Sequence, residues 1–216
     1  MLICFGSFVC AMPGVNMQYP HRFRTYKATE NESGNCKIWE AAHATAATPM
    51  LFKGIEISGL GGIKEFFIGG GIKCNNPAKE VVDEASQIYG DNQHVGVLIS
   101  LGSGHPGAIG LETQGSQGKN LMSILMKIAN DCEAVADEFL QRCINLPHVY
   151  FRFNVAHGME HVSLEEWERI GEVMAHTRAY LQDSEVSGLL DAAVQHLCKF
   201  SLQRQEVTVA ALHMLL

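Results

Sequence analysis

The stretch Phe67-Ile68-Gly69-Gly70-Gly71-Ile72-Lys73-Cys74-Asn75-Asn76-Pro77 joins a short apolar strand, three successive glycines and the start of a helix. Three glycines at a strand end indicate a plain tight turn, unusual backbone angles or the close approach of another group, because glycine has no Cβ. Asn75 and Asn76 are either helix-capping residues or residues that tie the turn to its neighbours. We therefore expect a strand, a turn and a helix in succession here.

The residues on both sides of this turn predict an alternation of strands and helices. The helix after Pro77 is the clearest, because apolar side chains recur at helical spacing up to Gly90: Ala78, Val81, Val82, Ala85 and Ile88. Strands are expected over 2–10, 22–27, 65–68 and 95–100, and another helix from about residue 37 to Pro49. This order predicts an α/β protein with parallel crossovers in a layered sheet.

The composition changes after residue 104. Six glycines lie between residues 102 and 119, which predicts a flexible loop or a domain boundary. Helical patterns follow over about 121–143, 164–182 and 186–200, the second behind a capping box at Ser163–Glu166. We therefore expect an α/β region at 1–104, a glycine-rich loop at 105–120 and an α-helical C-terminal region at 121–216.

Composition and charge exclude several classes of protein. The 216 residues are 47% hydrophobic and 18% charged, with a net charge of −7 and no run of Lys and Arg, which argues against nucleic acid as a ligand. Seven scattered cysteines without a C-x-x-C pair fit neither a disulfide framework nor a structural zinc site and indicate a reducing compartment. The first twenty residues lack a basic start, so no signal peptide is expected and the predicted location is cytoplasmic.

Two short motifs point to cofactors, but their context does not support either one. Gly102 to Gly107 matches the glycine pattern of a dinucleotide site, yet Pro106 and the following glycines do not open a helix. His157-Gly158-Met159-Glu160-His161 matches an inverted zinc-hydrolase pattern, which requires a helix, and Gly158 disfavours one. We interpret both motifs as loops and expect no metal ion and no organic cofactor.

No serine is placed as the nucleophile of a serine hydrolase. Such an enzyme needs G-x-S-x-G, and no serine of this chain has glycine at both the −2 and the +2 position. Ser103 and Ser116 have glycines nearby but at other spacings. We interpret both as solvated loop serines.

Five blocks of sequence, in order over about 100 residues, resemble the second half of a patatin-like phospholipase domain of the fungal type. They are Phe8-Val9-Cys10-Ala11-Met12-Pro13, Phe23-Arg24-Thr25-Tyr26, the block from Ile38 to Pro49, the block from Phe67 to Pro77, and Leu98-Ile99-Ser100-Leu101-Gly102-Ser103-Gly104. The tail from Phe151 to Leu197 resembles the helical extension that follows such domains. The resemblance implies a partial three-layer sheet domain followed by helices.

The resemblance also implies a chemistry and the positions that would carry it. Patatin-like enzymes hydrolyse acyl esters of phospholipids and other lipids with a Ser-Asp dyad and a glycine-rich oxyanion loop, and they need no cofactor. The family's Asp-Gly-Gly turn falls on Gly69-Gly70-Gly71, so Gly69 stands at the position of the catalytic Asp. The serine elbow and the oxyanion loop precede the matching region. The implied partners are an acyl-ester lipid and, transiently, a membrane surface.

We expect from these departures that the chain by itself is not a competent hydrolase. Three interpretations remain open: a truncated or mis-assembled piece of a lipid acyl hydrolase, a non-catalytic relative that binds lipid or a partner protein through its helical tail, and a zinc hydrolase built on His157, Glu160 and His161. The missing N-terminal strands would leave an open apolar strand edge near residues 3–10, which predicts aggregation or pairing with another chain.

Overall fold

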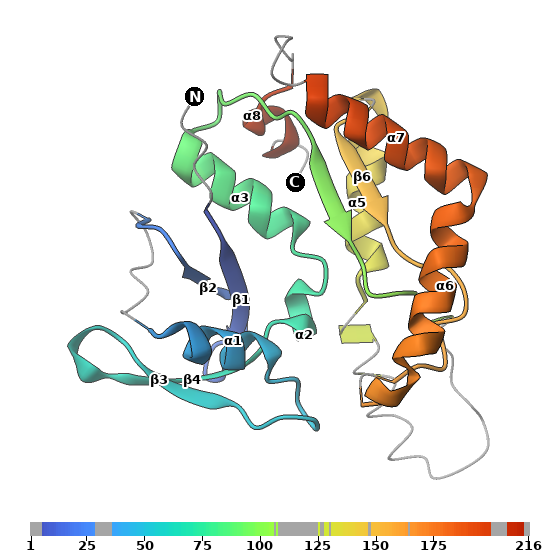
Figure 1. Cartoon of the computed structure of the whole chain (residues 1–216). Coiled ribbons are helices and arrows are strands. Elements are labelled where there is room, and N and C mark those ends of the chain that lie inside the picture. Colours follow the sequence, from blue (N-terminus) through green and yellow to red (C-terminus); the bar gives the residue numbers. More distant parts are fainter. Residues whose placement is uncertain are drawn as a thin grey trace. The chain divides into compact units, whose positions relative to one another are not determined.

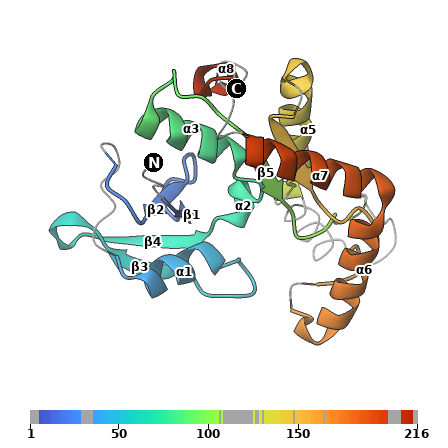
Figure 2. The ribbon, with the colours of Figure 1, turned by 45° about the horizontal axis from the view of Figure 1, so that its top comes forward.

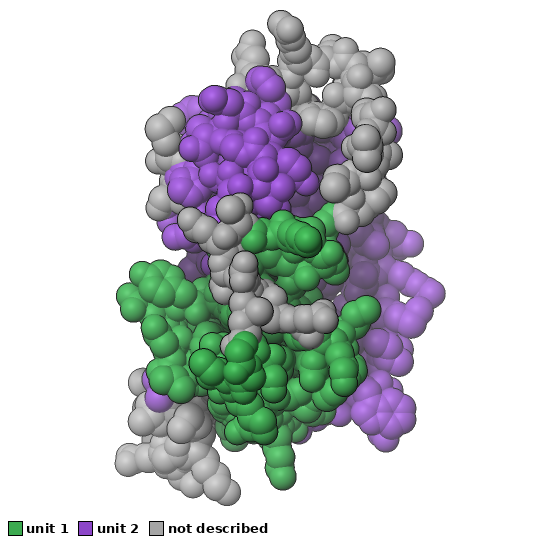
Figure 3. All heavy atoms as spheres, turned by 90° about the vertical axis from the view of Figure 1, so that its left-hand side faces the viewer, with its two compact units in different colours: residues 1–77 green, residues 78–216 purple. Residues whose placement is uncertain are grey.

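The computed structural model describes residues 6–28, 36–105, 107, 125, 128–129, 131–146, 148–163, 165–199 and 207–213. The chain is mixed α/β and divides into two compact units, residues 1–77 and residues 78–216, which are coloured separately in Figure 3. The two are called unit 1 and unit 2 below. The predicted division at residues 104 and 105 concerns the extent of the resemblance and stays a prediction.

Unit 1 is a four-stranded antiparallel sheet with one helix on it (Figure 1). Its elements are β1 (Phe8–Pro13), β2 (His21–Arg24), α1 (Ile38–Ala46), β3 (Ile55–Ser58), η1 (Leu60–Gly62), β4 (Lys64–Gly69) and α2 (Gly71–Cys74). The strand order is β2-β1-β4-β3, with Val9 opposite Phe23, Met12 opposite Ile68 and Ile57 opposite Glu65. Helix α1 lies beside β1, β3 and β4, and Figure 2 shows it next to β3 and β4.

The core of unit 1 lies between this sheet and α1. Ala11, Phe23, Ala44, Ile57 and Phe67 are buried there, and the rings of Phe23 and Phe67 meet edge to face with centroids 5.1 Å apart. Small residues on α1 let the helix approach the sheet closely. The helix begins after Lys37, whose backbone N–H donates to the Glu40 carboxylate at 2.7 Å, as in a capping box.

Unit 2 contains a parallel strand pair and most of the helices. Its elements are α3 (Ala78–Tyr89), β5 (Leu98–Leu101), α5 (Glu133–Arg142), η2 (Cys143–Asn145), β6 (Tyr150–Phe153), η3 (Trp167–Arg169), α6 (Ile170–Gln182), α7 (Ser184–Lys199) and α8 (Val209–His213). Strands β5 and β6 pair in parallel, with Leu98 opposite Tyr150 and Leu101 opposite Phe153.

Strand β6 lies between helices α5 and α7 (Figure 1). Its side chains contribute to two hydrophobic clusters. Tyr150 packs with Phe139 of α5 and Val209 of α8, whereas Phe151 and Phe153 pack with Ala193 of α7. Because successive side chains of a strand point to opposite faces, Arg152 shares the face of Tyr150. The side of β6 that meets α5 therefore carries both an aromatic ring and a guanidinium.

The structure confirms the mixed α/β class and changes its details. The parallel pair is β5 with β6, whereas the strands of unit 1 pair antiparallel and not through parallel crossovers. Strands β3 and β6 were not predicted. Among the described residues, the predicted helix at 121–143 is helical over α5, and the helix expected from 164 begins at Ile170, after the capping box. Residues 108–124 lie outside the described residues.

The expected open edge near residues 3–10 is wrong for one side of β1 in the part that the structure describes. Phe8 to Ala11 pair with β2, whereas β4 pairs with Ala11 to Pro13, so within the described sheet Phe8 to Cys10 have a strand partner on the β2 side. The edge strands of this described sheet are β2 and β3. Residues 3–5 lie outside the described residues.

Candidate functional site

The glycine turn lies at the end of β4, where three segments of unit 1 come together. Gly69 closes β4 and donates its N–H to the Ala47 carbonyl at 2.8 Å, and Gly70 donates to the Thr45 carbonyl at 3.3 Å. Gly70 has φ −66° and ψ −21°, and none of the three glycines has a positive φ. The turn therefore does not need glycine for unusual backbone angles.

Close approach of the backbone is what requires glycine at this turn. A Cβ added at Gly69 would lie 2.9 Å from both Ala47 C and Thr48 N, and one at Gly70 would lie 2.2 Å from the Cys10 carbonyl oxygen. That oxygen also accepts a hydrogen bond from Thr45 Oγ1 at 2.7 Å. Of the alternatives in the sequence, close approach is the one that this geometry favours.

The two asparagines after the turn differ in exposure. Asn75 is the C-cap residue of α2 and is exposed, whereas the Asn76 side chain is buried, with 4% of its surface accessible. A buried amide is almost always hydrogen-bonded, because leaving it unpaired is costly. The part that Asn75 and Asn76 play in supporting the turn stays a prediction.

A buried polar cluster lies at the carboxyl end of the parallel pair in unit 2. The Arg152 guanidinium, whose side chain is 7% exposed, donates to Glu133 Oε1 at 3.0 Å, to Ser100 Oγ at 3.0 Å and to Cys132 Sγ at 3.2 Å. Asn154 Nδ2 donates to the same Glu133 oxygen at 2.6 Å. We call these five residues, Ser100, Cys132, Glu133, Arg152 and Asn154, the Arg152 cluster.

The Arg152 cluster fixes the loop that follows β5. Gly104 N–H donates to Asn154 Oδ1 at 2.7 Å, and a Cβ at Gly102 would lie 2.3 Å from the same oxygen. Gly104 has φ +115°, a conformation that L side chains rarely adopt. Residues 102–105 are not helical, so the dinucleotide motif does not open a helix in the part that the structure describes, as phosphate binding at such a motif requires.

Electrostatics disfavour the Cys132 thiol of this cluster as a nucleophile. Burial raises the pKa of the Cys132 thiol to about 11, and the hydrogen bond that it donates to Glu133 adds to this effect. For Glu133, burial alone would raise the pKa, but hydrogen bonds from Arg152, Cys132 and Asn154 outweigh it and lower the pKa. Cys132 is therefore a protonated donor near neutral pH, and thiolate chemistry is disfavoured.

Local sequence patterns do not predict this cluster. Its members come from three separate segments, and β6 lies within the region 121–216 that the sequence predicts to be helical. The aromatic residues on both sides of Arg152, in Tyr150-Phe151-Arg152-Phe153, are typical of a strand and could have indicated one. Ser103 lies in the loop that the cluster fixes, and Ser116 lies outside the described residues.

The zinc interpretation fails on local structure. Residues 157–161 are not helical, and Gly158 has φ +91°, so the two histidines are not one helical turn apart. His157 is 94% exposed and its Nδ1 lies 3.9 Å from Glu160 Oε1. Within the described ranges, no group of three or more His, Cys, Asp and Glu residues is placed to hold a metal ion.

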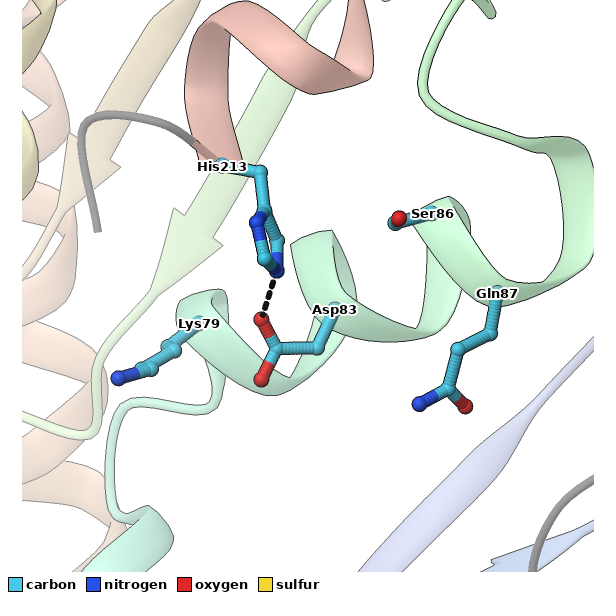
Figure 4. Close-up of a pocket in the computed structure, with 5 residues that line it drawn as sticks. All are labelled: Lys79, Asp83, Ser86, Gln87 and His213. Atoms are coloured by element: carbon cyan, nitrogen blue, oxygen red, sulfur yellow. Dashed lines mark ion pairs between the residues drawn. The ribbon is translucent and has the colours of Figure 1, made fainter.

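An open hollow lies between α3 and α8 of unit 2 and is lined by Lys79, Asp83, Ser86, Gln87 and His213 (Figure 4). His213 Nε2 lies 3.2 Å from Asp83 Oδ1, the pair that the dashed line marks. Ser86 does not complete a triad with this pair, because its hydroxyl donates to Asp91. The hollow therefore offers an ion pair but no activated nucleophile.

Comparisons with known proteins support a patatin-like, lipid-hydrolase-like relationship. The chain is similar to "Patatin-like phospholipase 1" of Plasmodium falciparum (isolate NF54), with 27% identity over 185 residues, which is 77% of this chain. The chain spans only 27% of the length of that relative. No protein-family profile matches the chain, and no solved structure matches it. None of the helices in the described ranges is long and apolar enough to cross a membrane.

Proposed function

We propose that this chain is part of a patatin-like lipid acyl hydrolase domain of the fungal type, in which Gly69 has replaced the catalytic Asp. The relationship to a phospholipase supports the lipid class, and the resemblance of Phe67 to Pro77 supplies the position. By this proposal the 216 residues by themselves do not hydrolyse acyl esters. Their substrate class would be phospholipids or other acyl-ester lipids.

One observation carries the proposed lack of activity. The space that a side chain at residue 69 would need is occupied by backbone atoms of Ala47 and Thr48 at 2.9 Å. A carboxylate cannot be added there unless that backbone moves. Losing the base of a nucleophile and base pair typically lowers the rate of a hydrolase by about 10⁴-fold or more, and the chain also has no G-x-S-x-G serine.

The test is hydrolysis of p-nitrophenyl octanoate by the purified chain, beside a heat-denatured sample and the variant Gly69→Asp. We expect no release of p-nitrophenol above the denatured control from any of the three. Gly69→Asp should also melt at a lower temperature than the unmodified chain, because the new Cβ meets backbone.

Activity in the unmodified chain would overturn the proposal. Ser103→Ala and Ser86→Ala, together with mass spectrometry after labelling with a fluorophosphonate, would then identify the serine responsible. Activity in Gly69→Asp alone, at an unchanged melting temperature, would contradict the close packing described here and favour a simple loss of the Asp.

A second candidate function is a non-catalytic module that binds lipid or protein. The observation that favours it is the exposure of large apolar side chains on two loops of unit 1, described next. A module of this kind needs no nucleophile, so its binding can be measured without any turnover.

A further inference from the structure

We propose that two loops of unit 1 form a docking surface for an anionic lipid bilayer. The first connects β1 to β2 and the second connects α1 to β3. Their apolar side chains and one neighbouring ring make up what we call the loop patch: Val15, Met17, Tyr19, Met50, Phe52 and Phe66. The choice of a lipid as the occupant rests in part on the proposed lipid function.

The two loops meet at the ring of Phe66. A Cβ added at Gly14 would lie 2.5 Å from Phe66 Cδ1, and one at Gly54 would lie 2.4 Å from Phe66 Cζ. The ring therefore lies directly against both glycines, one from each loop. Gly14 also donates its N–H to the Phe66 carbonyl at 2.8 Å, which fixes the first loop to β4.

Ordered turns hold the apolar side chains of the loop patch in water. In the first loop, Gln18 N–H donates to Asn16 Oδ1 at 3.1 Å, and Lys73 Nζ donates to the Gln18 carbonyl. In the second loop, the Thr48 carbonyl accepts from Leu51 at 3.1 Å and from Phe52 at 2.9 Å. The apolar side chains of the loop patch are therefore exposed on hydrogen-bonded turns and not on a frayed chain end.

The second loop carries backbone strain at its most exposed apolar residue. Met50 has φ +74°, in the left-handed region that non-glycine residues seldom occupy, and 83% of its surface is accessible. Nearby, Phe52 is 64% exposed, and in the first loop Val15 is 98% exposed. Strain of this kind persists where the surrounding structure holds it and is often associated with a function. Apolar residues displayed in this way point to a partner that removes them from water.

The charge around the loop patch favours an anionic partner. Neither loop contains an acidic residue; Lys53 adjoins Phe52, and exposed Lys73 contacts the first loop. The acidic neighbour of the loop patch, Glu56 opposite Phe66, is paired with Lys64 at 3.4 Å. Residues 1–77 hold seven Lys and Arg and five Asp and Glu, a net charge of +2, whereas residues 78–216 hold nine and eighteen, a net charge of −9. The loop patch therefore belongs to the basic part of an acidic chain.

These features match the needs of a surface-bound protein. Apolar side chains at an interface enter roughly the outer 5–10 Å of a bilayer, and lysines beside them attract anionic headgroups. Tyr19, with an apolar ring and a polar hydroxyl, suits the headgroup level. No helix of the described residues spans a bilayer, so such contact would be peripheral.

The experiment is flotation of the purified chain with vesicles of phosphatidylcholine alone and of phosphatidylcholine with 30% phosphatidylserine. We expect binding to the anionic vesicles that weakens at 0.5 M NaCl, and at least about tenfold weaker binding by the variant Met50→Asn/Phe52→Ser. Asn is chosen because it tolerates a positive φ. Lys53→Glu should weaken binding about threefold or more.

Matched controls distinguish binding through the loop patch from non-specific binding through other exposed apolar or charged side chains. Ile144→Ser removes an equally exposed apolar side chain, 76% accessible, from unit 2, and Lys79→Glu makes the same charge change in unit 2. Both should bind as the unmodified chain does, and all variants should keep its melting temperature. Equal weakening by Ile144→Ser would overturn the proposal.

Two other results would also overturn it. One is no binding of the unmodified chain to either vesicle. The other is a concentration-dependent dimer in sedimentation velocity without lipid that Met50→Asn/Phe52→Ser abolishes, which would assign the loop patch to a second copy of this chain. Because flotation measures no turnover, an active chain that fails to bind, or an inactive chain that binds, tells the two proposals apart.

Discussion

The two units solve different packing problems at the ends of their strands. In unit 1, neighbouring backbone atoms pack directly against the end of β4. They leave no space for a side chain at Gly69 or Gly70. In unit 2, the ends of β5 and β6 are filled by polar side chains, the Arg152 cluster. The difference teaches that polar groups gathered at strand ends are no proof of a catalytic site. Here they fix a loop, whereas the position that the resemblance assigns to catalysis carries no side chain.

The largest expected effect comes from breaking the Arg152 cluster. Arg152→Met would leave the partly buried Glu133 carboxylate without its cation and should cost about 3 kcal/mol of the free energy of unfolding, the low end of the range for a buried pair, because Glu133 keeps its hydrogen bonds from Asn154 and Cys132. Urea unfolding followed by circular dichroism measures this loss. Arg178→Met, on the exposed side of α6, is the control and should change stability by less than about 0.5 kcal/mol. Similar losses of unfolding free energy in both variants would mean that the Arg152 cluster does not stabilise the fold.

The next effect tests the close packing in unit 1. Gly70→Ala would place a Cβ 2.2 Å from the Cys10 carbonyl oxygen and should cost about 1 to 3 kcal/mol. Gly188→Ala in α7 is the matched control, because a Cβ there meets nothing within 4 Å. It should stabilise by about 0.5 to 1 kcal/mol, since alanine favours the helix. Two changes of the same sign in thermal melts would contradict the difference between the two sites.

Acid should weaken the Arg152 cluster in unit 2. The folded-state pKa of Glu133 lies below its ordinary value of 4.5, so its ionised form stabilises the folded state above that pH. This contribution is lost as the pH falls from about 4.5 through the lowered pKa. Unfolding of the unmodified chain and of Glu133→Gln at pH 7, 4.5 and 3.5 measures it. The stability difference between the two should shrink with falling pH, and a constant difference would be evidence against the ionised form.

The smallest expected effect is a slow rate of alkylation at Cys132. With a pKa raised to about 11 by burial, this thiol should react with iodoacetamide at pH 7.5 at least tenfold more slowly than the exposed Cys198. Mass spectrometry of the alkylated peptides gives both rates. In 8 M urea the two cysteines should label alike, and rapid labelling of Cys132 in the native chain would argue against the cluster.

Part of this architecture could be predicted from the sequence. Helix α3 follows from its apolar spacing, since Ala78 and Val82 are buried as the period requires. The direction of β4 relative to β1 could not be predicted from the sequence, because the sequence pattern does not indicate β3. Its hairpin through Gly59 and Gly62 adds one reversal of the chain, which turns an expected parallel pair antiparallel.

The candidate site shows the same division between local and long-range information. Three glycines in a row indicate a position where a Cβ is not tolerated or where the backbone angles are unusual. Close approach of another group is one of the alternatives that the sequence predicts. Which atoms approach Gly69 depends on α1, about twenty residues earlier, and no local pattern encodes that. The Arg152 cluster depends on three distant segments, so its pairings follow from the fold and not from spacing.

The tight contact at Gly69 also bears on how such a turn can change over evolutionary time. Two glycine codons differ by one nucleotide from aspartate codons and the other two from glutamate codons, so a carboxylate at this position is always one mutation away. In the present packing that mutation meets the Ala47–Thr48 backbone at 2.9 Å and must wait for a second change that moves α1. A carboxylate at residue 69 is therefore one step away in the genetic code, whereas contact with this backbone blocks it in the folded chain.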